Sequence, residues 1–63
     1  MMIVQHITVR VWDKPYVVEV HQRSKSVWIA RGEYMGESHE TKDSSARSAA
    51  ARWREWATYK GNG

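Results

Sequence analysis

The stretch that decides the fold is residues 45–60, SARSAAARWREWATYK, where apolar side chains take up the spacing of a helix. The positions that share one helical stripe are Ala46, Ala49, Ala50, Trp53 and Ala57. Small side chains along such a stripe let a helix lie close to a sheet, and Trp53 supplies a large anchor. A polar residue at 43–45 can cap the start of this helix, and Gly61 can end it.

The sequence before the helix alternates as strands do. Residues 3–12 and 16–21 alternate apolar and polar side chains, with Gln5 the exception, and Asp13-Lys14-Pro15 between them predicts a turn. Residues 27–31 are rich in β-forming side chains and predict a third strand. Beyond it, either the strand continues with a bulge, or a hairpin leads into a fourth strand at 35–41, which we favour.

Together these patterns predict an α+β fold, in which a three- or four-stranded antiparallel β-meander precedes one C-terminal amphipathic helix that packs on one sheet face. With 63 residues the chain holds one small domain, expected at 1–60 with a fraying tail at 61–63. It has no Cys, so disulfides cannot stabilise it, and its four Trp and three Tyr must supply the core. Trp56 and Tyr59 lie at the edge of the helical stripe, where they either complete the core or contact another chain.

Charge and composition exclude several classes of function. Ten Lys and Arg against seven Asp and Glu give a net charge of +3, which favours anionic partners such as nucleic acid. No apolar run is long enough to span a membrane and no signal peptide opens the chain, so a cytoplasmic protein without a membrane partner is expected. His6, His21 and His39 lack ligand spacing, and so small a domain has little room for a pocket, so no metal, cofactor or enzymatic activity is expected.

One face of the sheet is left uncovered by the single helix. The residues predicted on it are His6, Thr8, Arg10, Trp12, Val17, Glu19, His21, Val27, Ile29 and Arg31. Arginines interleaved with aromatic rings suit the stacking and phosphate contacts of nucleic acid, and Arg47 and Arg54 share one flank of the helix. The sequence therefore predicts a small basic domain that binds duplex DNA or RNA. Its candidate residues are Arg10, Trp12, His21, Arg31, Lys42, Arg47 and Arg54.

An alternative function uses the apolar side chains of the same face. A protein-interaction module or homodimer, acting as an adaptor or inhibitor, would use Trp12, Val17, Val27 and Ile29. Binding that weakens steeply with salt would distinguish the nucleic-acid function from this one.

Residues 26–57 resemble the C-terminal half of double-stranded RNA-binding domains. Tyr34-Met35-Gly36-Glu37 and the Ala-rich residues 45–51 are similar to that family's last strand and last helix. With Ala49-Ala50 on the family's Ala pair, Lys42 falls at a phosphate-contacting Lys, whereas Asp43 replaces a second one. The resemblance implies duplex RNA binding without the family's first helix, since residues 1–22 are predicted as strand.

A second resemblance is to the arm-type DNA-binding domains of phage-type tyrosine integrases. Trp28-Ile29-Ala30 and Thr41–Ala46 resemble that family's strand and helix-start patterns, with one extra residue before Ala46. This resemblance implies that the sheet enters the major groove of DNA.

Overall fold

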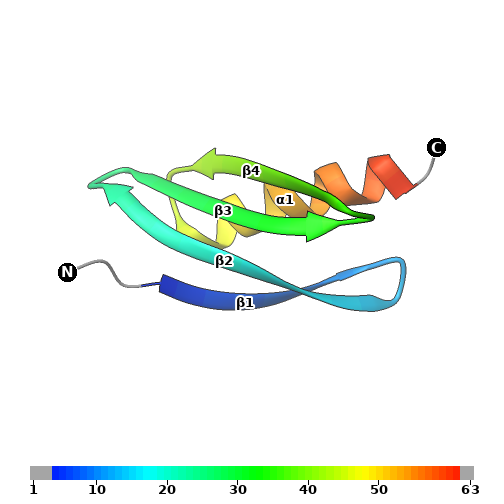
Figure 1. The fold of residues 1–63 in the computed structure, drawn as a ribbon. Helices are drawn as coiled ribbons and strands as arrows, with labels where there is room; N and C mark the ends of the chain where they lie inside the picture. The colour runs from blue at the N-terminus through cyan, green and yellow to red at the C-terminus, as the bar shows by residue number, and fades with distance from the viewer. Residues whose placement is uncertain (1–3, 62–63) are drawn as a thin grey trace.

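A computed structural model, which describes residues 4–61, has four strands followed by one helix (Figure 1). The strands are β1 (Val4–Val11), β2 (Lys14–Ser24), β3 (Val27–Tyr34) and β4 (Glu37–Asp43). They form one antiparallel sheet in the order β1-β2-β3-β4, and helix α1 (Ala46–Gly61) packs on one of its faces. The predicted α+β fold is confirmed in its four-stranded form, and β4 lies two residues later than the predicted 35–41.

Two tight turns join the outer pairs of strands. Trp12 and Asp13 (φ 52° and 66°) connect β1 to β2, and Met35 and Gly36 (φ 54° and 78°) connect β3 to β4. Two consecutive left-handed residues are the backbone of the hairpin turn that matches strand twist. The turn predicted at 13–15 is thus corrected to Trp12-Asp13, and Pro15 lies inside β2. Pro15 is tolerated there because the pairing of β2 with β3 begins only at Glu19, so its missing N–H removes no bond from that ladder.

The core lies between the sheet and α1. From the helix, Ala49, Ala50, Trp53 and Ala57 are buried, which confirms four positions of the predicted stripe, and Ala46 is half-buried. The sheet contributes the buried side chains of Val11, Val18, Val20, Ala30 and Tyr34. Trp53 is fully buried, and its ring centroid lies 6.3 Å from that of Tyr16 and 6.5 Å from that of Tyr34. A Cβ on Gly32 would lie 2.8 Å from two ring carbons of Trp53, so this glycine lets the indole lie against β3.

The helix ends are defined by short contacts. The Ser45 hydroxyl accepts a 3.1 Å hydrogen bond from the Ser48 amide, so Ser45 is the capping residue among the three considered. At the other end α1 includes Gly61, one residue beyond the predicted domain boundary at 60, and Lys60 forms a 3.2 Å ion pair with Glu37. Asn62 and Gly63 of the expected tail, and Ile3 of the expected first strand, lie outside the described residues.

Candidate nucleic-acid interface

The open face of the sheet carries most of the side chains predicted on it. Strand register places His6, Thr8 and Arg10 of β1 on this face, together with Val17, Glu19, His21, Ile29 and Arg31 of β2 and β3. Val27 has the same parity as Ile29 in β3. The fourth strand adds Ser38, Glu40 and Lys42, because these residues pair with Glu33, Arg31 and Ile29. The open face predicted from three strands is therefore present in the structure, and β4 widens it by one strand.

Carboxylates balance the cations of this face. Arg31 lies opposite Glu19 in β2 and opposite Glu40 in β4, so it has an acidic neighbour on each side. Across the face the cations are Arg10, Arg31 and Lys42, and the carboxylates are Glu19, Glu33 and Glu40. Opposite charges at cross-strand distance partly cancel each other's field. The middle of the open face consequently offers little net attraction to a phosphate backbone.

Trp12 does not lie on the open face, which corrects the position predicted for it. It occupies the β1–β2 turn, and its indole Nε1 donates a 3.2 Å hydrogen bond to the Thr58 carbonyl in the last part of α1. A bulky residue rarely adopts a positive φ, and the bond to the helix helps to hold this one in place. The alternation of β1 therefore stops at Val11, and Trp12 turns toward the helix side.

The apolar residues of the alternative interface are not equally accessible. Ile29 lies at the centre of the open face but is only 3% exposed, whereas Val17 is 59% exposed. Val27 is half-buried at the start of β3. Since Ile29 is already covered by its neighbours and Trp12 lies elsewhere, the four residues do not form one apolar patch of the kind that protein interfaces use.

The arginines of α1 lie on two flanks. Nε of Arg54 donates a 2.7 Å hydrogen bond to the Arg10 carbonyl at the outer strand β1. β1 is an edge strand with no strand on its outer side, and the Arg10 carbonyl accepts this bond from the helix instead. Two candidate residues, Arg10 and Arg54, are thereby brought together.

On the opposite flank, Arg52 binds Asp43. Their Nε–Oδ2 distance is 2.6 Å, and the Arg52 hydrogen bond is the largest cause of the lowered pKa of Asp43, ahead of the hydrogen bond from the Ser44 amide. The same hydrogen bond raises the pKa of Arg52. Asp43 is therefore the ion-pair partner of Arg52.

One end of the domain collects cations from three elements. Figure 1 shows the β2–β3 turn, the end of β4 and the start of α1 at the same end of the molecule. We call this end of the molecule the basic end, and its four cations are Arg23, Lys25, Lys42 and Arg47. The first turn of α1 has no acidic residue, and Asp43, the nearby carboxylate, is bound to Arg52. The positive end of the helix dipole adds to the field of these side chains.

Arg23 and Lys25 are not among the candidate residues predicted from the sequence. The signal that could have found them is topological, since the β2–β3 turn and the β4–α1 junction must lie at the same end of an antiparallel meander. This topological signal identifies the residues only when the length and register of β4 are known, because these place Lys42 opposite Ile29, near the β2–β3 turn.

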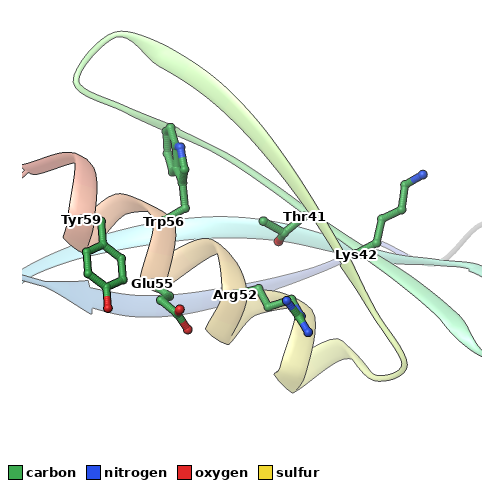
Figure 2. A pocket seen from close by; sticks show the side chains of 6 residues that line it. All are labelled: Thr41, Lys42, Arg52, Glu55, Trp56 and Tyr59. Carbon is green, nitrogen blue, oxygen red and sulfur yellow. The ribbon is translucent and has the colours of Figure 1, made fainter.

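A groove runs between β4 and α1, at the edge of the sheet (Figure 2). It has a volume of about 300 Å³ and is lined by Thr41, Lys42, Arg52, Glu55, Trp56 and Tyr59. Trp56 packs against the core and stacks on His39, with ring centroids 4.1 Å apart and an interplanar angle of 7°. Tyr59 is 71% exposed, so of the two aromatic residues at the edge of the stripe only Trp56 joins the core.

Two kinds of feature are absent from residues 4–61. No helix in this part of the chain is long and apolar enough to cross a membrane. No three His, Asp or Glu side chains of these residues gather as metal ligands would.

Comparisons with known proteins identify no family for this chain. No protein-family model matches it, and neither the curated proteins nor the solved structures give a significant match.

Proposed function

We propose that this domain binds nucleic acid through its phosphate backbone, and that the basic end makes the contact. The observation that supports the proposal is that Arg23, Lys25, Lys42 and Arg47 belong to the β2–β3 hairpin, the end of β4 and the start of α1, which lie at the same end of the molecule (Figure 1). Four cations from three elements, without an uncommitted carboxylate among them, make a more attractive surface for phosphate than the balanced open face.

The geometry suits a contact at two points. The β2–β3 turn projects beyond the sheet with Arg23 and Lys25 beside its tip, and the start of α1 presents Arg47 near unpaired backbone N–H groups. Phosphates on two neighbouring stretches of backbone can then be bound at once. Such contacts position a protein on a duplex without reading its sequence. The proposal therefore predicts binding with little sequence preference.

The resemblance to double-stranded RNA-binding domains is compatible with this surface but differs from it in one respect. Lys42, which aligns with a phosphate-contacting Lys of that family, lies in β4, and α1 begins four residues later at Ala46. Lys42 still belongs to the basic end, so the proposal keeps its role in phosphate binding while placing it on a strand.

The experiment is a titration of a labelled mixed-sequence duplex, as DNA and as RNA, at two salt concentrations. The test variant is Arg23→Gln with Lys25→Gln, and the matched control is Arg10→Gln with Arg31→Gln, which removes the same charge from the open face. We expect the test variant to weaken binding and to reduce the salt slope by about two, since each lost phosphate contact contributes roughly 0.9. The control should bind nearly as the parent does.

A larger loss of duplex affinity in the Arg10/Arg31 variant would indicate that the open face, and not the basic end, binds nucleic acid. No salt-sensitive binding of either duplex at low salt would overturn the proposal. In that case, a dimer in sedimentation of the free protein would support the interaction module. Circular dichroism melts of both variants confirm that each is folded before binding is compared.

A further inference from the structure

The groove between β4 and α1 combines an exposed aromatic ring, a cation and a carboxylate along one helix flank (Figure 2). From it we infer a second contact, which rests on the proposed function and deepens it. We propose that the groove binds one unstacked nucleobase with its phosphate, from a strand end or a single-stranded stretch, and prefers bases that carry an exocyclic amino group.

Tyr59 supplies the surface on which a base can stack. Its ring is 71% exposed, and within residues 4–61 it has neither a hydrogen bond nor an aromatic partner. Trp56, one turn earlier, is held by its stack on His39 and has the Lys60 ammonium 5.8 Å from its ring centroid. Trp56 therefore serves as a fixed wall of the groove, and Tyr59 is the free ring. Stacking on an aromatic side chain contributes to the binding of any base.

Arg52 forms the anionic-ligand end of the groove. Arg52 is 65% exposed, and its single hydrogen bond within the described residues uses Nε, which leaves both terminal nitrogens available. The bond to Asp43 fixes the guanidinium, so little side-chain freedom remains to be lost when a phosphate binds. Arg52 and Tyr59 are seven residues apart on α1, which separates them by about 10 Å along the helix axis.

Glu55 lies between these two ends and gives the groove its selectivity. It is exposed and lines the groove on the same flank as Arg52 and Tyr59. An ionised carboxylate only accepts hydrogen bonds, so it binds an amino group and repels a carbonyl oxygen. Cytosine carries an amino group where thymine carries a carbonyl oxygen, so the groove should prefer cytosine.

The experiment compares oligodeoxycytidylate with oligothymidylate of equal length, two pyrimidine single strands whose bases differ in the group at C4, in the proton at N3 and in the C5 methyl group. The variants are Tyr59→Ala, with Tyr59→Phe as the control that keeps the ring, and Glu55→Gln. We expect Tyr59→Ala to weaken binding of oligodeoxycytidylate about 5- to 150-fold, which corresponds to the loss of one base stack. Tyr59→Phe should bind as the parent does, and Glu55→Gln should remove the preference for cytosine over thymine.

Unchanged affinity in Tyr59→Ala, or equal affinity of the parent for the two oligonucleotides, would overturn the groove assignment. The Arg23/Lys25 variant separates this outcome from a failure of the proposed function. If only the groove assignment is wrong, the Arg23/Lys25 variant still binds duplex more weakly than the parent does. If the basic end fails alone, that variant binds duplex as the parent does, while Tyr59→Ala still weakens binding of oligodeoxycytidylate.

Discussion

The two faces of the sheet each bury a large side chain near the middle, but in opposite surroundings. On the covered face Trp53 is enclosed by Tyr16, Tyr34 and Trp56, and no charged side chain is buried within residues 4–61. On the open face Ile29 is buried beneath polar and charged neighbours in the flanking strands. The comparison indicates that the covered face supplies the stability of the fold, whereas the open face tolerates exchange of its charges.

The largest effect is expected from Trp53→Ala. Removing the one large side chain of the central helix stripe should cost about 3–5 kcal/mol, because the small residues beside it cannot fill the cavity. This equals most of the stability available to a domain of this size, so the variant should be largely unfolded at room temperature. Urea denaturation followed by circular dichroism measures the loss. Ile29→Ala on the open face is the comparison, and it should cost less because flanking side chains and water can fill its site. A near-parental melting temperature for Trp53→Ala would reject the helix-on-sheet core.

Gly32→Ala tests the same contact from the sheet side. The new Cβ would lie 2.8 Å from Cε2 and Cζ2 of Trp53, and the aromatic rings around that indole restrict its movement. We expect a destabilisation of about 1–3 kcal/mol, as for other overpacked cores. Gly36→Ala is an informative contrast, since it meets no atom within 4 Å and is opposed only by its positive φ. A Gly32→Ala protein as stable as the parent would show that Trp53 can withdraw from β3.

The covered face could be predicted from the sequence because its signals are local. The alternation of β1 and β2 and the stripe from Ala49 to Ala57 each identify a buried side without knowledge of the partner element. The fourth strand was harder, since ESHETKD has no apolar residue and its covered side consists of half-buried polar residues such as His39 and Thr41. There the fold is set by the hairpin at Met35-Gly36 and by contact with α1, including the 2.8 Å hydrogen bond from the Thr41 hydroxyl to the Ala49 carbonyl.

The candidate site was less predictable because it depends on register. Alternation continued to Trp12 in the sequence, and only the left-handed turn moved that side chain to the helix side. The carboxylate of Glu40 became a neighbour of Arg31 only through the pairing of β3 with β4. The position of Trp12 and the pairing of Glu40 with Arg31 both depend on contacts between segments, so the pattern of a single segment cannot predict them.

A smaller effect is expected on the stability of the protein at acidic pH. The hydrogen bond from Arg52 lowers the pKa of Asp43 below its usual value of 3.8. A carboxyl whose pKa is lower in the folded state contributes stability that is complete above its unfolded pKa and is lost as the pH falls through the folded one. We therefore expect the parent to lose stability below about pH 4 more steeply than Asp43→Asn, which lacks this titration. Denaturation midpoints measured between about pH 2 and 6 give the difference. Parallel curves for the two proteins would mean that the ion pair adds nothing in solution.

The smallest effect on stability, and the sharpest test of the open face, is expected from Glu19→Gln with Glu40→Gln. Both carboxylates are exposed, so the free energy of unfolding should change by no more than about 0.5 kcal/mol per substitution. Their removal leaves Arg31 without its two acidic neighbours, and the face acquires a net positive charge. We expect duplex affinity at low salt to rise and its salt slope to steepen, because a second surface can then bind phosphate.

The matched control for that last variant is Asp13→Asn with Glu37→Gln, which changes the net charge equally but away from the open face. An equal rise in both variants would assign the effect to overall charge. A rise confined to the Glu19/Glu40 variant would show that these carboxylates keep an otherwise adequate cationic face from binding nucleic acid. An unchanged affinity in both would show that duplex binding is insensitive to charge outside the basic end.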